Sequence, residues 1–300
     1  MHLNEFEVFF QHKNVLVTGG AGFIGSNLVK LLVNLDANVT SLDNYLSGLV
    51  ANHHDGCTYV TGSAANIFDF FDPNYFDLIF HFGEYSRVEP SIKFSGEALD
   101  NIYSPMAKVL EFWRKSKAKL IYSGSSTKFS EDGTGRNLSP YTFAKASNSD
   151  LVVNYAKWFG LPYTLVYFYN VYGKNEIRTG DYATLIGRYK HLVSTGHSRL
   201  PVTLPGTQVR NFTHIDDVIR GIIISTINGS GDLFGIGSDD AYSVLEVCRM
   251  FGCEPEYLPL NLANRMKGRV LNEKVKQLGW SQLRSLPNDI DLFLNNLNVS

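Results

Sequence analysis

The sequence predicts an α/β fold in which helices cover both faces of a parallel sheet, and two observations lead to it. Short apolar runs alternate with segments of helical periodicity through the first half of the 300-residue chain. This alternation is typical of a doubly wound parallel sheet. The composition, 44% hydrophobic and 19% charged, is that of a globular chain able to bury a sizeable core.

The expected strands are short and apolar, and the helices between them carry apolar residues at helical spacing. Strands are expected at 14–19, 38–43, 57–62, 76–82, 118–124 and 162–168, and helices at 23–35, 97–116 and 140–160. From about residue 170 the alternation of strands and helices becomes irregular. A helical pattern at 214–227 and an apolar run at 232–237 then indicate a return to the sheet. We therefore expect one domain from 1–169 plus about 211–237, and a smaller discontinuous domain from 170–210 plus about 238–300.

Charge and cysteine content exclude several classes of function. The formal net charge is −2 and no run of Lys and Arg occurs, so no nucleic-acid partner is expected. No apolar run approaches the roughly 18 residues of a membrane span, and the N-terminus lacks the features of a signal peptide. We expect a cytoplasmic protein with no membrane partner. Cys57, Cys248 and Cys253 form no CxxC pair, so neither disulfides nor a metal site is expected.

The stretch VLVTGGAGFIG joins the first strand to the first helix and carries Gly19, Gly22 and Gly25 at GxxGxxG spacing. Glycines let the backbone turn tightly and approach a pyrophosphate, which the helix N-terminus also attracts. Asp43 ends the second strand, where a carboxylate accepts hydrogen bonds from the adenosine ribose and repels a 2′-phosphate. The pattern predicts a dinucleotide site that prefers NAD to NADP. The alternative for Asp43 is a simple turn residue.

A tyrosine and a lysine four residues apart open the helix expected at 140–160. Tyr141 and Lys145 share one face of that helix. An ammonium beside a phenol favours the phenolate, which is useful for general acid–base catalysis. The pair follows the hydroxyl-rich stretch IYSGSSTKF at 121–129. Together with the dinucleotide site, this predicts a catalytic centre; the alternative is an exposed aromatic residue beside a solvated lysine.

Several motifs in order resemble one enzyme family. TGGAGFIGSNL, LDNYLSG, IFHFGE, YSGSS, SPYTFAK, FYNVYGK and GTQVRNFTHIDDV are similar to the extended short-chain dehydrogenase/reductase family, over residues 13 to 225. The nearest branch is that of the NAD-dependent nucleotide-sugar epimerases and dehydratases. The resemblance implies a Rossmann-type domain, with the smaller domain binding the nucleotide sugar.

The resemblance also implies roles for individual residues. Tyr141 would be the acid/base, Lys145 would hold the nicotinamide ribose, and Ser125 would hydrogen-bond the sugar oxygen. Cofactor contacts would come from Gly19, Gly22 and Gly25, Phe23 and Ile24 at the pyrophosphate, Asp43 and Asn44 at the adenosine ribose, Ser63 and Ala64 near the adenine, and Phe82, Gly83 and Asn101. Substrate contacts would come from Asn170 and Arg210 at the diphosphate, Arg265 as a second clamp, Ser126, Glu84 and Arg87.

Two of these assignments have alternatives. The arginines could instead form surface ion pairs, although a guanidinium is well suited to hold a diphosphate. Glu84 and Arg87 stand where relatives often have small residues. They could contact the sugar or pair with each other.

The absence of a carboxylate at Ser125-Ser126-Thr127 separates the chemistries of the branch. Dehydratase relatives have Thr-Asp-Glu there, and decarboxylating relatives keep the glutamate. Elimination needs an acid and a base, whereas hydride removal from C4 and its return to the other face need only Ser125, Tyr141, Lys145 and NAD. We therefore expect a 4-epimerase acting on a nucleoside diphosphate sugar, with UDP as the expected nucleotide. The alternatives are a dehydratase, with Glu84 supplying a carboxylate, a 4-keto reductase, or a dinucleotide-sensing protein without turnover.

A homodimer is also expected. Relatives pack the helices at 97–116 and 140–160 into a four-helix interface, and this chain offers Phe112, Leu151 and Trp158 as outward candidates. Apolar residues on the outside of a doubly wound domain need cover.

Overall fold

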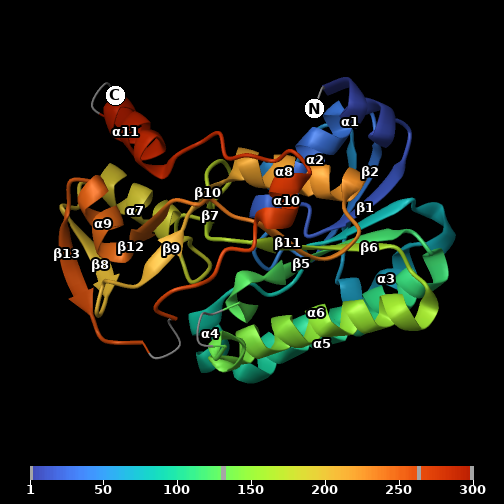
Figure 1. The fold of residues 1–300 in the computed structure, drawn as a ribbon, viewed down its shortest axis with the longest axis horizontal. Helices are drawn as coiled ribbons and strands as arrows, with labels where there is room; N and C mark the ends of the chain where they lie inside the picture. Colours follow the sequence, from blue (N-terminus) through green and yellow to red (C-terminus); the bar gives the residue numbers. More distant parts are fainter. Residues whose placement is uncertain (1–2, 130–132, 262–264, 298–300) are drawn as a thin grey trace.

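A seven-stranded parallel sheet forms the centre of the computed structural model, which describes residues 3–129, 133–261 and 265–297 (Figure 1). Its strand order is β11-β6-β5-β4-β1-β2-β3. The strands are β1 Asn14–Thr18, β2 Asn38–Asp43, β3 Cys57–Thr61, β4 Leu78–His81, β5 Lys119–Ser125, β6 Tyr163–Phe168 and β11 Gly231–Ile236. The predicted doubly wound sheet is confirmed, since all seven strands lie where the apolar runs placed them.

Helices cover both faces of this sheet. One layer holds α1 Leu3–Phe10, α2 Phe23–Asn34, α8 Ile215–Asn228 and α10 Glu273–Gln277; the other holds α5 Ser95–Ser116 and α6 Pro140–Phe159. Shorter helices are α3 Ile67–Phe70, α4 Val88–Lys93 and the 3₁₀ turns η1 Val50–Asn52, η2 Ala64–Asn66, η3 Pro73–Tyr75, η4 Ser126–Lys128 and η5 Gly135–Asn137.

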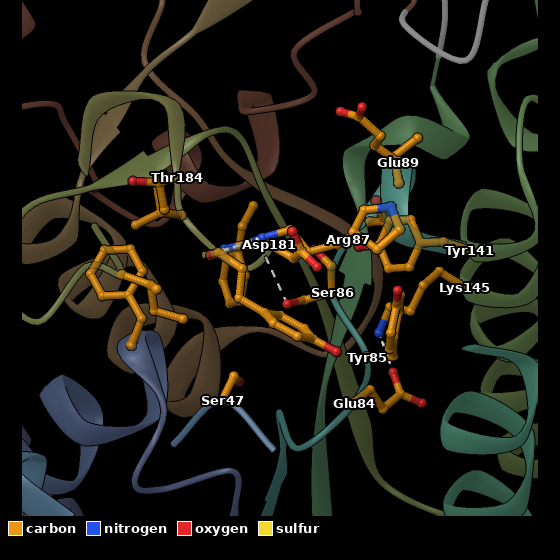
Figure 2. A pocket seen from close by; sticks show the side chains of 18 of the residues that line it. Ser47, Glu84, Tyr85, Ser86, Arg87, Glu89, Tyr141, Lys145, Asp181 and Thr184 are labelled. Carbon is orange, nitrogen blue, oxygen red and sulfur yellow. Dashed lines mark hydrogen bonds and ion pairs between the residues drawn. The ribbon is translucent and has the colours of Figure 1, made fainter. Parts of the chain in front are cut away.

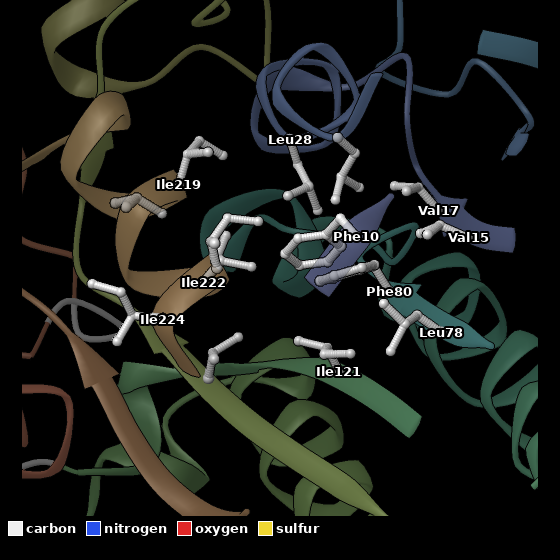
Figure 3. Close-up of a cluster of buried hydrophobic side chains, with 14 of the residues drawn as sticks. Phe10, Val15, Val17, Leu28, Leu78, Phe80, Ile121, Ile219, Ile222 and Ile224 are labelled. Atoms are coloured by element: carbon white, nitrogen blue, oxygen red, sulfur yellow. The ribbon is translucent and has the colours of Figure 1, made fainter. Parts of the chain in front are cut away.

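Alternate residues of each strand feed two separate cores. Val15 and Val17 of β1 pack with α2 and α8 in the cluster of Figure 3, whereas Leu16 between them packs on the opposite face with α5 and α6. A strand buried on both faces needs apolar residues at every position. This requirement explains why the strands could be predicted from continuous apolar runs in the sequence.

The chain beyond β6 builds a second region with its own core. It contains β7 Val171–Tyr172, α7 Leu185–Ser194, β8 Arg199–Thr203, β9 Val209–Asn211, β10 Thr213–His214, β12 Ala241–Ser243, α9 Val244–Met250, β13 Glu254–Leu258 and α11 Leu286–Leu297. Tyr189, Leu200, Val247, Phe251 and Ile290 are among its buried side chains. The proposed domain limits remain a prediction.

Two details of the helices bear on the sequence-based expectations. Phe112 was expected to point outward from α5, but it is fully buried and its ring packs beside those of Phe68 and Phe76, so that expectation is wrong. Phe112 and Trp113 are adjacent apolar residues, and their order in the sequence does not show which of them face the protein interior. Leu151 of α6, a second outward candidate, is partly buried. Among the described residues, no helix has both the length and the apolar character required to cross a membrane.

Candidate active site

One pocket runs along the carboxyl ends of β1, β2, β4 and β5 and continues into the second region. Ligands of open parallel sheets bind at this edge. Every residue that the sequence predicts at the cofactor or substrate lines this pocket. The structure therefore brings together side chains as distant in sequence as Gly19 and Arg265. Their individual roles remain predictions.

The turn between β1 and α2 is a close backbone contact that admits only glycine. Gly19 has a φ of +76°, and a Cβ there would lie 2.7 Å from the Cα of Gly83. A Cβ on Gly25 would lie 2.0 Å from the carbonyl oxygen of Gly19. α2 begins after Gly22 without a side-chain cap, so its first amides face the pocket. Open amides at a helix N-terminus fit the pyrophosphate of NAD.

Asp43 lies at the end of β2 with both carboxylate oxygens engaged by backbone amides. Oδ2 accepts from the amide of Ala21 at 2.9 Å, and Oδ1 accepts from that of Tyr45 at 2.8 Å. Asp43 thus orders the turn and lines the pocket at once. Ser63, also on this side, uses its hydroxyl to accept from the amide of Ala65 at 3.2 Å.

The start of α6 is fixed by a reciprocal cap. The Ser139 hydroxyl accepts from the amide of Thr142 at 3.1 Å, and the Thr142 hydroxyl accepts from the amide of Ser139 at 2.9 Å. Pro140 occupies the first turn, where a missing amide hydrogen costs nothing. This cap places Tyr141 in the first turn and Lys145 one turn later, both on the pocket wall (Figure 2).

Lys145 is directed toward Glu84, with which it forms a buried ion pair. The side chains of Lys145 and Glu84 are only 5% and 2% exposed. Burial raises the pKa of Glu84, but the ammonium of Lys145 and His81 outweigh it and lower this pKa to about 2. Glu84 is therefore an anion held inside the wall, with almost no surface for a sugar.

Arg87 does not pair with Glu84, which answers one of the open alternatives. Its Nε donates to the carbonyl of Tyr182 at 3.0 Å, and its Nη1 donates to the carbonyl of Ser86 at 2.9 Å. Figure 2 shows it beside Tyr141. Within the described ranges, no carboxylate lies within ion-pair distance of Arg87.

The hydroxyls at the end of β5 and in η4 form hydrogen bonds with one another and with an arginine. The Ser125 and Thr127 hydroxyls lie 2.8 Å apart. Arg265 donates from Nη1 to the Ser126 carbonyl at 2.6 Å and from Nη2 to the Ser126 hydroxyl at 3.2 Å. No carboxylate joins this group among the described residues.

Arg210 and Arg265 share the wall of the pocket in the second region. Burial and the nearby Arg265 lower the pKa of Arg210 to about 10. Arg210 donates to the carbonyl of Val209 at 2.9 Å, and no ion pair with a carboxylate holds either arginine in the described part of the chain. The surface ion pair considered for them is thus not observed. Asn170, with a φ of +37°, donates to the carbonyl of Asn211 at 3.1 Å.

Three residues of the site were missed in the sequence. Tyr122 donates to Glu84 at 2.8 Å, and the Asn148 amide donates to Glu84 at 3.0 Å. The Nε2 of His81 lies 3.6 Å from the same carboxylate. Asn148 stands three residues after Lys145, on the same helix face, and this spacing was the available signal. Tyr122 and His81 look like core residues in sequence.

The comparisons with known proteins agree with the geometry. Residues 15–237 match the model of the NAD dependent epimerase/dehydratase family. The UDP-N-acetyl-alpha-D-glucosaminuronate decarboxylase of Bacillus cytotoxicus is 30% identical over 79% of this chain and 78% of that protein. The UDP-glucose 4-epimerase of Corynebacterium glutamicum is 26% identical over 94% of this chain and 96% of that protein.

Among solved structures, the UDP-glucose 4-epimerase of Thermotoga maritima, determined with UDP-glucose, is similar with a TM-score of 0.85. It shares 25% identity, and the match covers 95% of this chain and 99% of that one.

Proposed function

Because the chain belongs to the NAD dependent epimerase/dehydratase family, we propose that it inverts C4 of a nucleoside diphosphate sugar, most simply a UDP-sugar. The cofactor of the family is NAD, as the sequence predicted, and the glycine turn and open helix N-terminus described above fit it. When bound, NAD supplies an acceptor for the hydride from C4, and its reduced form supplies the donor that returns this hydride to the sugar.

The residues of the chain supply proton transfer and positioning. Tyr141 would take the proton of the C4 hydroxyl and give it back, and Ser125 would hydrogen-bond the same oxygen. Arg210 and Arg265 would hold the diphosphate while the keto sugar rotates and presents its other face to the cofactor. Their unpaired charges support this assignment, since a partly buried cation is stabilised by an anion nearby.

The observation that carries the proposal is the state of Glu84. Loss of the C6 hydroxyl needs an acid at that oxygen and a base at C5. Glu84 was the one carboxylate considered for such a role. It is paired with Lys145 inside the wall, and its low pKa makes it a poor acid. The other pocket carboxylates described are Asp43 at the far end and the exposed Glu89 and Asp181.

The test is incubation of the NAD-loaded enzyme with UDP-glucose, UDP-N-acetylglucosamine and their uronic acids in D₂O, followed by proton NMR. We expect a C4-inverted sugar without deuterium on carbon. A 4-keto-6-deoxy product labelled at C5 would identify a dehydratase, and a pentose with released CO₂ would identify a decarboxylase. Tight NAD binding with no turnover of any sugar would favour the sensing protein. Each of these three results contradicts the epimerase.

The proposed assembly is a homodimer through α5 and α6. Trp158 and Phe159 at the end of α6 are 62% and 47% exposed, and Phe143 at its start is 49% exposed. Apolar side chains at both ends of this helix favour a partner that covers it. Light scattering at micromolar concentration should give the mass of two chains, and Trp158→Glu should give the mass of one. A wild-type monomer contradicts the dimer. A cytoplasmic location likewise remains a prediction.

A further inference from the structure

All three hydrogens of the Lys145 ammonium are directed to acceptors of the protein. They go to the carboxylate of Glu84, to the hydroxyl of Tyr122 at 3.0 Å and to the carbonyl of Ser123 at 2.6 Å. Each of these acceptors sits on a sheet strand or at its end. Lys145 is therefore saturated within the wall of the pocket, and its charge is balanced there.

The carboxylate that balances this charge is itself held from several sides. Tyr122 of β5 and Asn148 of α6 donate to its two oxygens. The Asn148 amide also reaches the carbonyl of Ile102 on α5 at 3.3 Å. The Nδ1 of His81 lies 2.7 Å from the hydroxyl of Thr18, and its Nε2 faces Glu84. A side chain held by residues of β4, β5 and α6 has a specific position.

The balanced pair lies on the same wall as the tyrosine of the proposed reaction. Tyr141 and Lys145 line one pocket from one helix. The titratable and charged groups around this wall come from several elements. Tyr122 of β5 and His81 of β4 lie beside Glu84. Arg87, Arg265 and Tyr85, whose ring centroid is 6.5 Å from that of Tyr141, lie beside Tyr141. A negative charge within this group opposes formation of a phenolate, whereas an unbalanced ammonium favours it.

We propose that Glu84 is a positioning residue that holds Lys145 against the sheet and offsets its charge, so that Tyr141 becomes active as a base at a higher pH than an unpaired lysine would allow. This inference rests on the proposed role of Tyr141 as acid/base. It does not depend on which sugar is bound or on which product is formed.

The first experiment follows the pH dependence of the initial NAD reduction by the nucleotide sugar, a step that does not require epimerisation to follow. Glu84→Gln keeps the shape of the side chain and removes its charge. We expect the acid limb of kcat/KM to move to lower pH by about one unit, the low end for a nearby charge. Glu89→Gln removes a carboxylate from the exposed part of the same pocket and should leave the limb in place.

A second variant separates charge from packing. Tyr122→Phe removes one hydrogen bond from Lys145 and one from Glu84 without changing the charge of the pair. We expect a lower rate but an unmoved acid limb. An acid limb that stays in place in Glu84→Gln, or that moves equally in Tyr122→Phe, would overturn the charge-balancing role.

A third measurement needs neither cofactor nor activity, so it remains valid if the proposed function fails. Thermal unfolding of Glu84→Gln, Lys145→Met and the double variant forms a double-mutant cycle. Because each single change leaves a buried partner without its counter-charge, the double variant should be more stable than the sum of the single losses predicts. Strictly additive losses would contradict the pair. Failure of Glu84→Gln alone to fold, with the double variant folded, would support it.

Discussion

The positively charged side chains of the pocket differ in whether a carboxylate of the protein neutralises them. At the reactive end, Lys145 is paired with Glu84, and both side chains are almost fully buried. Arg210 and Arg265, both supplied by the chain beyond β6, donate to the backbone carbonyls of Val209 and Ser126 and meet no carboxylate among the described residues. The difference indicates which charge belongs to the protein and which awaits a ligand. A cation already neutralised inside the wall can tune a neighbour, whereas an unpaired one attracts an anion.

The largest expected effect tests the reactive end. Tyr141→Phe should lower kcat by roughly 10²–10⁴, the usual contribution of a general acid/base, with KM for the nucleotide sugar nearly unchanged. Steady-state kinetics and circular dichroism would check this. Tyr103→Phe, on α5 and outside the pocket, is the matched control. Near-normal turnover in Tyr141→Phe would mean that the proton takes another route.

The opposite pattern is expected at the unpaired end. Arg210→Gln should raise KM by roughly 10- to 100-fold, since a hydrogen bond to a charged group contributes about 1.5–3 kcal/mol. The effect on kcat should be smaller. Arg199→Gln is the control, because Arg199 lies on β8 in the same region but outside the pocket. If kcat falls while KM stays constant, Arg210 acts in the chemical step, and its assignment to substrate binding is wrong.

Asp43 provides a third arrangement, a carboxylate held by backbone amides. We expect wild-type protein to bind NAD at least tenfold more tightly than NADP, about 1.4 kcal/mol, because the carboxylate repels a 2′-phosphate. Asp43→Asn should narrow this ratio, as measured by calorimetry. Asp72→Asn is the control, since Asp72 also accepts from a backbone amide but lies outside the pocket. Equal affinities in the wild type would contradict the ribose assignment.

The smallest effect concerns acid stability. Burial raises the pKa of Glu84, but Lys145 and His81 outweigh it and hold the value at about 2, below the ordinary 4.5. A lowered folded-state pKa stabilises the fold above the ordinary value and loses this contribution as the pH falls toward 2. Calorimetry at pH 7, 5 and 3 should therefore show the Tm of wild type approaching that of Glu84→Gln. A constant difference would show that the pair does not remain charged.

The sheet and the nucleotide end of the pocket could be predicted because they depend on local sequence. Continuous apolar runs specify buried parallel strands, and the glycine turn is one contiguous segment. The pairing of Glu84 could not be foreseen, because it depends on the register of β4 and β5 beside α6. Sequence spacing suggested Arg87 as its partner, yet the strand end turns the two side chains apart. Beyond residue 170 the helices and strands are short and far apart in sequence. Neither their packing nor the carbonyl partner of Arg210 could therefore be predicted.

The path of the C-terminal segment limits how this protein can be dissected. Val275 of α10 and Trp280 complete the buried cluster on one face of the sheet, and the Trp280 indole donates to the carbonyl of Asp217 at 2.9 Å. A fragment ending near residue 237 would leave a hole in that cluster and expose its aliphatic lining to water. Such a piece should aggregate when expressed alone. A split enzyme is more promising if residues 265–297 are added in trans to the rest of the chain than if the chain is simply ended after the last strand of the sheet.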